Sequence, residues 1–372
     1  MINAHIIGWG KYLPEKIVTN AELAERVGID AQWLETRTGI QARHIAEPKQ
    51  ASADMASRAA RAALEIADVH PKQLNLIIVA TNTPDHIFPA TACLVQHALG
   101  ARAAGTFDLA AGCSGFLYAL VSAVQFIKSG AYRNILVVGV ETTSRVVNWN
   151  DKTICPYFGD GAGAVVLTAS EQPGGLLSFA LHADGSGGDW LILPAGGTRL
   201  PLSQQVLDDG LQYGRMDGKA VFRYGVRESI RNAQTVLRDA KLKIDDVDIY
   251  IPHQTNITLI AQVAEKLRVP PGRTIVNLAQ YANISSAALP VTLCDAIQAG
   301  RVKPGAKILL TAYGAGLASA GMVWQWSKEM PQKKMAFLKR FGHALWDAQA
   351  AFRARLFQLE HRVDALLPDE DL

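Results

Sequence analysis

A cysteine between an apolar strand and an apolar helix is the residue of this chain best suited to covalent chemistry. Residues 107–116 read Phe-Asp-Leu-Ala-Ala-Gly-Cys-Ser-Gly-Phe and lead into an apolar helical stretch at 116–127. This order predicts that Cys113 lies at a helix N-terminus. Such a terminus carries roughly half a positive charge, so we expect the thiol to be drawn toward its nucleophilic thiolate. A buried structural thiol is the alternative, and this segment alone leaves both open.

Two later segments contain a histidine and an asparagine at similar junctions. His253 follows the apolar run 247–251, which we expect to be a strand. Ligand sites of open α/β sheets lie at such carboxyl ends. Asn283 lies among small residues before another apolar helical run. A single histidine is usually a packing residue and a single asparagine a cap or turn, so the combination with Cys113 carries the weight.

Four further motifs accompany Cys113, His253 and Asn283. They are Trp33-Leu-Glu-Thr-Arg-Thr-Gly-Ile40, Phe158-Gly-Asp-Gly-Ala-Gly163, Leu181-His-Ala-Asp-Gly185 and Lys303-Pro-Gly305. With these motifs the chain, from about residue 3 to about residue 326, resembles the 3-oxoacyl-[acyl-carrier-protein] synthase III family of thiolase-fold condensing enzymes.

The resemblance implies a reaction as well as a fold. The fold is a five-layered αβαβα arrangement, usually in homodimers. The reaction is a decarboxylating Claisen condensation, in which an acyl thioester condenses with malonyl-ACP to give 3-oxoacyl-ACP. The expected acyl thioester is an acyl-CoA starter. A non-decarboxylating acyltransferase of the same fold stays open as an alternative. A non-catalytic dimeric scaffold is less favoured, because Cys113, His253 and Asn283 are all present.

The condensation assigns a role to each of these residues. Cys113 would hold the acyl group as a thioester, which divides the reaction into two easier steps. His253 and Asn283 would donate hydrogen bonds to the malonyl thioester carbonyl while carbon dioxide leaves. Backbone N–H groups of Cys113 and of the turn at Gly314 and Ala315 would bind the oxyanion. No metal or other cofactor is expected, because no His/Asp/Glu cluster has ligand spacing and the CoA and phosphopantetheine thioesters are substrates.

The resemblance also implies a binding site for coenzyme A. Trp33, Arg37 and Asn256 match family positions that contact this ligand. Lys152 stands where the family has the arginine on the other side of the adenine; a lysine keeps the charge but loses the flat stacking surface. An ordinary helix-end cap and ion pair is the alternative for Trp33 and Arg37.

Other positions differ from the family pattern or mark further contacts. Arg223 matches a basic position implicated in docking of the acidic carrier protein, and a solvated helix charge is an equal alternative. Phe88 matches a residue that reaches toward the acyl pocket across the dimer. Thr258 replaces an arginine near the phosphopantetheine arm. Ala282 and Ile284 replace a glycine and a threonine beside Asn283, and this added bulk could reshape the acyl pocket.

Composition agrees with an ordinary soluble enzyme. The chain has 372 residues, of which 49% are hydrophobic and 19% charged, and a net charge of +3. This charge is too small to indicate nucleic-acid binding. The four cysteines have neither metal-ligand spacing nor the density of a secreted domain, and no apolar run reaches membrane-spanning length. We therefore expect a cytoplasmic location.

Alternating strands and helices predict a largely parallel sheet in two related halves. The expected strands lie at 4–8, 74–80, 106–109, 134–140, 162–168, 176–182, 247–251, 274–276, 307–311 and 322–326. Residues 62–82 and 234–256 repeat one pattern of amphipathic helix, polar turn and strand. We therefore predict an N-terminal subdomain at 1–172 with Cys113 and a C-terminal subdomain at 173–328 with His253 and Asn283.

The remaining residues, 329–372, predict an amphipathic helical extension. Apolar residues recur every seven positions from Leu338 to Leu366. We favour packing of this stripe on the body of the protein or on the second subunit. Binding of an acidic carrier protein or of an anionic membrane surface is the less favoured alternative.

Overall fold

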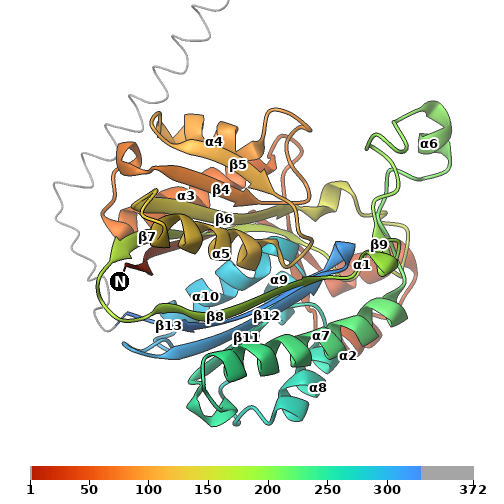
Figure 1. Cartoon of the computed structure of the whole chain (residues 1–372). Coiled ribbons are helices and arrows are strands. Elements are labelled where there is room, and N and C mark those ends of the chain that lie inside the picture. Colours follow the sequence, from red (N-terminus) through yellow and green to blue (C-terminus); the bar gives the residue numbers. More distant parts are fainter. Residues whose placement is uncertain (1, 328–372) are drawn as a thin grey trace, which may run out of the picture.

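Two mixed β-sheets form the frame of the molecule (Figure 1). The computed structural model describes residues 2–327, and the helical extension predicted at 329–372 lies outside them. The first sheet has the strand order β1-β7-β6-β4-β5. Its strands are β1 (Asn3–Tyr12), β7 (Asp160–Ser170), β6 (Asn134–Thr142), β4 (Leu76–Ala80) and β5 (Gly105–Leu109).

The second sheet repeats the plan of the first. Its order is β8-β13-β12-β11. Its strands are β8 (Gly175–Ala183), β13 (Ala318–Gln325), β12 (Lys307–Gly314) and β11 (Ile249–Pro252). In both sheets the first three strands are antiparallel and the next pair is parallel. The duplication inferred from the sequence is therefore visible in strand order and direction.

Two expectations about the strands are wrong. The sheets are mixed rather than largely parallel, because β6–β7 and β12–β13 are each joined without a crossover α-helix and pair antiparallel. The segment 274–276 is not a strand. Thr274 forms a single parallel bridge to Tyr250, at the position that β5 occupies in the first sheet.

Three pairs of helices complete five layers, which confirms the αβαβα fold (Figure 1). Apolar faces of α3 (Ser52–Ala67) and α4 (Thr91–Leu99) cover the outer face of the first sheet. The helices α5 (Gly115–Lys128) and α10 (Ala288–Gln298) lie between the sheets. The outer face of the second sheet is covered by α7 (Gly218–Asp239) and α8 (Ile257–Leu267).

The central helix α5 is apolar over most of its circumference, as a helix between two sheets must be. Phe116, Leu120 and Ile127 are buried against both sheets in one core. Full burial of one such side chain stabilises the fold by about 1.5–3 kcal/mol. This packing fixes the start of α5, which begins two residues after Cys113.

The remaining elements are shorter. They are β2 (Lys16–Thr19), α1 (Asn20–Val27), α2 (Ala31–Thr38), β3 (Ala42–Ile45), β9 (Leu191–Ile192), α6 (Gln204–Asp208), β10 (Arg215–Met216) and α9 (Leu278–Tyr281). Within residues 2–327, no helix is both long and apolar enough to cross a bilayer.

Candidate active site

Cys113 lies at the start of the central helix, as its sequence context predicts. Its neighbour Ser114 is the N-cap residue of α5, and the Cys113 side chain is buried. Gly314, at the end of β12, packs against the backbone of Cys113 so closely that a Cβ on Gly314 would lie 2.3 Å from the Cys113 nitrogen. The turn predicted to supply oxyanion donors is therefore in contact with Cys113.

The protonation state of the thiol differs from the sequence-based expectation. Burial raises the pKa of Cys113 to about 12. A hydrogen bond with the Ser285 side chain acts in the opposite direction, and the negative charge of Glu141 adds to the rise. The thiol pKa is therefore not lowered, as its place at a helix terminus had led us to expect, because burial is the largest influence on it.

His253 follows β11 at the carboxyl end of the parallel pair β11–β12. Its backbone N–H donates to the carbonyl of Thr311 at 2.8 Å, and its ring lies edge-on to Tyr313 at 5.6 Å between centroids. The ring is 1% exposed, and within residues 2–327 neither ring nitrogen has a hydrogen-bond partner. Burial lowers the pKa of His253 to about 3, so the ring is neutral at physiological pH. A neutral imidazole keeps one N–H donor.

Asn283 lies in the loop between α9 and α10 and is held on three sides. Its backbone N–H donates to the Tyr157 carbonyl at 2.8 Å, and its carbonyl accepts from the Gly159 N–H at 3.1 Å. The side-chain Oδ1 accepts from the Ser285 N–H at 2.8 Å. With Oδ1 engaged, the Nδ2 hydrogens are the donors that Asn283 can offer to a substrate carbonyl.

The structure brings these three side chains to one cavity. Cys113, His253 and Asn283 line it together with Gly314 and Tyr313. Gly139 of β6 shows how tightly the Asn283 loop is packed, since a Cβ there would lie 2.3 Å from the Ser286 carbonyl oxygen. A thiol, a neutral imidazole and an amide from three separate junctions thus converge, which is the set that acyl transfer to sulfur and enolate stabilisation require.

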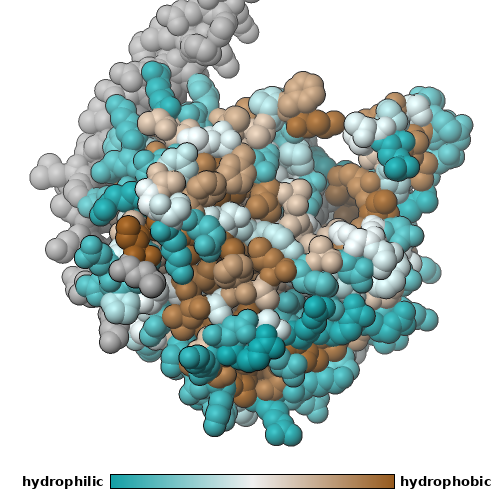
Figure 2. Space-filling model, viewed as in Figure 1, coloured by the Kyte–Doolittle hydropathy of each residue, from teal (hydrophilic) through white to brown (hydrophobic). Residues whose placement is uncertain are grey.

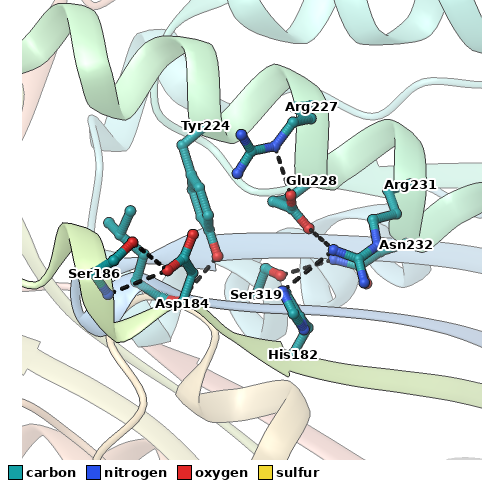
Figure 3. Close-up of polar contacts among 10 residues, drawn as sticks. His182, Asp184, Ser186, Tyr224, Arg227, Glu228, Arg231, Asn232 and Ser319 are labelled. Carbon is teal, nitrogen blue, oxygen red and sulfur yellow. Dashed lines mark hydrogen bonds and ion pairs between the residues drawn. The ribbon is translucent and has the colours of Figure 1, made fainter.

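Polar contacts connect α7 to the turn beside the nucleophile (Figure 3). The Tyr224 hydroxyl donates to the Leu317 carbonyl at 2.9 Å, and Asn232 Nδ2 donates to the Ser319 hydroxyl at 3.0 Å. Glu228 of the same helix is buried and forms ion pairs with the exposed Arg227 and Arg231. These contacts hold the end of the turn at 314–317 against a helix rather than leaving it as a free loop.

Glu141 is a buried residue that the sequence reasoning missed. It ends the apolar run of β6, and its carboxylate accepts a 3.1 Å hydrogen bond from Ser285. Glu141, Ser285 and Cys113 line a second cavity that adjoins the first at the thiol. The sequence did contain a signal for this residue, since Glu141 directly follows the wholly apolar segment 135–140. A carboxylate without an ion-pair partner is rarely buried, so its place at the end of a buried strand indicates a special role.

Known protein families match two parts of the chain. Residues 107–185 match the family model for 3-oxoacyl-[acyl-carrier-protein (ACP)] synthase III, and residues 237–326 match the model for its C-terminal region. The β-ketoacyl-[acyl-carrier-protein] synthase III of Caldanaerobacter subterraneus is 45% identical over 327 residues, or 88% of this chain and 99% of the relative. The chain belongs to the β-ketoacyl-[acyl-carrier-protein] synthase III family.

Further members of the synthase III family give the same result. The Roseiflexus castenholzii enzyme is 45% identical over 87% of this chain and 98% of its own length. The crystal structure of the synthase III from Aquifex aeolicus matches with a TM-score of 0.81 and 41% identity, over 87% of this chain and all of that one. The resemblance inferred from motifs is confirmed: the chain is an acyltransferase-type condensing enzyme of fatty acid biosynthesis with a thiolase-like fold.

Of the residues that the synthase III pattern assigns to coenzyme A, Asn256 lines the first cavity and Trp33, Arg37 and Lys152 do not. Trp33 is 49% exposed on α2, and the Arg37 guanidinium lies 5.7 Å from the centre of its ring. Asn256 lines the cavity, and its Nδ2 donates to the Arg37 carbonyl at 2.9 Å. Asn256 also caps α8, where Thr258 is exposed in the first turn. Lys152 is exposed on the loop between β6 and β7.

Two other predicted contact residues are exposed near the cavities rather than within them. Arg223 is exposed on α7, next to Val221 and Phe222, which line the first cavity. Phe88 is 84% exposed on the loop between β4 and α4 and lines neither cavity of its own chain.

The two substitutions beside Asn283 have different consequences. Ala282 adopts φ 56° and ψ −161°, a backbone conformation that is essentially reserved for glycine. Ile284 packs in a small apolar cluster with Ala287, Ala288 and Val291 and lines neither cavity. Ile284 therefore lies outside both cavities, whereas Ala282 places a strained backbone next to Asn283.

Proposed function

We propose that this synthase III family member catalyses the decarboxylating condensation of an acyl-CoA starter with malonyl-ACP through an acyl-Cys113 intermediate. The observation that carries the proposal is that the thiol lies where two cavities meet. The first, called the polar cavity for the two donors His253 and Asn283, is also lined by apolar side chains such as Phe222. The second, called the apolar cavity, is walled mainly by apolar side chains, among them Val146, Val147, Ile154, Leu191 and Leu193.

In the first step the apolar cavity receives the acyl chain of the starter. The Cys113 sulfur attacks the thioester carbonyl, coenzyme A leaves, and a thioester to Cys113 remains. The backbone N–H groups of Cys113 and of the turn at Gly314 and Ala315 stabilise the oxyanion; one such donor is worth about 3 kcal/mol. Contact between Gly314 and the Cys113 backbone supports this role of the turn.

In the second step the polar cavity receives the malonyl thioester. Loss of carbon dioxide leaves an enolate, and the N–H of the neutral His253 ring and the Nδ2 of Asn283 donate to its oxygen. The enolate carbon attacks the acyl-Cys113 carbonyl and the thiolate is expelled, which gives the 3-oxoacyl-ACP. The missing hydrogen-bond partners of the His253 ring support this role, because a buried donor without a partner is otherwise unfavourable.

Residues outside the catalytic set bind the substrates and connect the subunits. Trp33, Arg37, Asn256 and Lys152 bind coenzyme A, and Arg223 contacts the acidic carrier protein. We also propose a cytoplasmic homodimer. Large apolar side chains are exposed on β8 at Leu177, Phe179 and Leu181, and Phe88 is exposed on its loop. Hydrophobic residues gather over the middle of the face shown in Figure 2. Exposed apolar groups of this kind are typical of an interface between subunits.

The experiment is a coupled assay with acyl-CoA and malonyl-ACP in which carbon dioxide release and 3-oxoacyl-ACP are measured together. The wild-type enzyme should release one carbon dioxide for each condensation product. His253→Ala should still be acylated on Cys113 but should form little product. Full transfer to the carrier protein by His253→Ala without carbon dioxide release would instead identify a non-decarboxylating acyltransferase.

A further inference from the structure

Glu141 is a fully buried carboxylate for which the steps above have no role. Its oxygens accept hydrogen bonds from Asn82 Nδ2 at 2.7 Å, the Asn82 backbone N–H at 3.1 Å, Thr83 Oγ1 at 2.7 Å and Ser285 Oγ at 3.1 Å. In the part of the chain that the structure describes, no lysine, arginine or histidine forms an ion pair with it. A carboxylate at such depth is costly to desolvate, so its presence calls for a reason beyond stability.

The side-chain amide of Asn283 depends on one neighbour for its orientation. Tyr157 and Gly159 hold the backbone of Asn283. Among the described residues, the one hydrogen bond of its side chain is the 2.8 Å bond from the Ser285 N–H to Oδ1. The amide is planar, so fixing Oδ1 also fixes where Nδ2 lies. The direction in which Nδ2 donates is therefore set by Ser285.

Ser285 itself lies in a strained loop. Its φ is 50°, and Ala282, on the other side of Asn283, has a φ of 56°. This left-handed backbone is unfavourable for a residue with a side chain, so it persists only where its surroundings hold it. The Ser285 side chain is held by Glu141, because its hydroxyl donates to the carboxylate. The carboxylate thus anchors the residue whose N–H orients the Asn283 amide.

We propose that Glu141 is a positioning residue for the condensation step, which acts through Ser285 to hold the Asn283 amide in the orientation that donates to the enolate oxygen. The inference rests on the role of Asn283 in the function proposed above. Glu141 itself touches no reacting atom. It joins the end of β6 to two loops that are distant in the sequence, the loop after β4 and the loop that contains Asn283.

A carboxylate suits this position because the groups that meet it are donors. One oxygen accepts from Asn82 Nδ2 and Ser285 Oγ, and the other from Thr83 Oγ1. An ionised carboxylate accepts on both oxygens and donates on neither, so it satisfies these groups together. Burial raises the pKa of Glu141, and the hydrogen bonds from Thr83, Ser286 and Asn82 oppose this rise. The donors therefore favour the ionised form that the anchor needs.

The test starts from full-length enzyme already acylated on Cys113 and measures 3-oxoacyl-ACP formed in a single turnover with malonyl-ACP. Effects on the free thiol then do not enter the measurement. Glu141→Ala removes both acceptors, and Ser285→Ala removes the hydroxyl but keeps the N–H that donates to Asn283. We expect each to lower the condensation rate by roughly tenfold, less than loss of the amide itself, because the donor is misaligned rather than removed.

The same substitutions in an Asn283→Ala background distinguish positioning from general support. Because Glu141 and Ser285 act through Asn283, each should change the remaining condensation rate by less than about twofold in that background. A loss as large as in the wild-type background would overturn the proposal, since the two residues would then act by another route.

Ser286→Ala is the matched control. Ser286 follows Ser285, and its hydroxyl lies 2.9 Å from the same Glu141 oxygen and 2.8 Å from the Ala80 carbonyl oxygen. Its replacement removes local hydrogen bonding but leaves the contact between Ser285 and Asn283 intact. Condensation in Ser286→Ala should stay within about twofold of the wild type. Equal slowing in Ser286→Ala and Ser285→Ala would overturn the proposal in favour of general support of the loop.

A second readout needs no substrate. Deuterium exchange of the backbone amide at position 285, followed by mass spectrometry with fragmentation, reports directly on its hydrogen bond to Asn283 Oδ1. We expect this exchange to speed up by roughly tenfold or more in Glu141→Ala and in Ser285→Ala, because the loop opens more easily, and to stay unchanged in Ser286→Ala.

The exchange measurement also separates this proposal from the proposed function. Unchanged exchange in Glu141→Ala would overturn the anchor whatever the activity. If Glu141→Ala does not fold, Ser285→Ala decides by the same criterion. Faster exchange in these variants, together with a wild type that forms no 3-oxoacyl product from any starter, would contradict the proposed function and leave the anchor standing.

Discussion

The two cavities that meet at Cys113 differ in the groups that they offer to a substrate. The polar cavity contains the side chains of His253 and Asn283, which backbone hydrogen bonds hold in place. The apolar cavity contains Val146, Val147 and Ile154 from the loop between β6 and β7, and Leu193 from the C-terminal half. Under the proposed function, chemistry and recognition of the acyl chain lie on two sides of one sulfur atom, so a substitution on one side should leave the other side working.

The largest expected effect is on the polar side. Replacement His253→Ala or Asn283→Ala removes a donor to the enolate oxygen and should lower the rate of condensation by about 100-fold or more. Acylation of Cys113 should continue, because the apolar cavity is untouched. Stopped assays that separate the acyl-enzyme from the 3-oxoacyl product measure both steps.

The control for these variants is His182→Ala on β8, which replaces a histidine that lines neither cavity. It should condense at the wild-type rate. A parallel loss of acylation and condensation in His253→Ala would contradict the division between the two sides.

The next effect concerns the pH dependence of stability. The pKa of His253 is about 3 in the folded protein and about 6.5 in an unfolded chain. Between these values the unfolded state binds a proton that the folded state does not, so lowering the pH destabilises the fold. From pH 7 to pH 5 this amounts to about 2 kcal/mol in the free energy of unfolding.

Urea unfolding of the wild type and of His253→Gln at the two pH values measures this difference. The wild type should lose about 2 kcal/mol more than the variant. Equal losses would mean that His253 is charged or solvated in the folded enzyme, which would remove the basis for treating it as a neutral donor.

A smaller effect is expected on the apolar side. Gly214 lines the apolar cavity, and a Cβ there would make ordinary contacts, with Ile154 Cδ1 at 3.7 Å. Gly214→Val should therefore fold but fill space that an acyl chain would use. Loss of room for two methylene groups, at about 0.8 kcal/mol each, should shift the preference toward shorter starters by roughly tenfold.

Competition between acyl-CoAs of different length, read as acyl-Cys113 masses, measures this preference. Gly185→Val is the control, because no atom lies within 4 Å of a Cβ at Gly185. An unchanged preference in Gly214→Val would place the acyl chain elsewhere.

The smallest effect is at Ala282. Its left-handed backbone costs about 1–3 kcal/mol, and Ala282→Gly relieves this strain while it gains flexibility in the unfolded chain. We expect a net stabilisation of about 1 kcal/mol in denaturant unfolding. A loss of stability would show that the Ala282 methyl contributes more by packing with Ile40 and Ile260 than the strain removes.

The sequence was sufficient for features that depend on local order. The sequence correctly placed Cys113 between an apolar strand and an apolar helix, and His253 after β11. Hydrophobic periodicity and the turn residues between apolar runs determine where strands and helices begin. The duplication was also recognisable, since each half repeats the same series of elements.

Features that depend on distant contacts could not be read in this way. The prediction of largely parallel strands was wrong because hydrophobic periodicity does not specify the direction in which a strand joins its sheet. The predicted direction of the Cys113 pKa shift was wrong because the thiol is buried by residues distant in sequence. Gly314 and Ser285, which contact it, are about 200 and 170 residues away. Glu141 was missed for the same reason, as its partners Asn82 and Ser285 come from different elements.

The most direct test is intact-protein mass spectrometry after incubation with a panel of acyl-CoAs, on the wild type, Cys113→Ala and Cys294→Ala. Cys294 is a second buried free cysteine, on α10, outside both cavities. We predict one acyl group on the wild type and on Cys294→Ala and none on Cys113→Ala, with malonyl-ACP then discharging the acyl group as product. An adduct that persists in Cys113→Ala, or no adduct with any acyl-CoA, would contradict Cys113 as the acyl carrier.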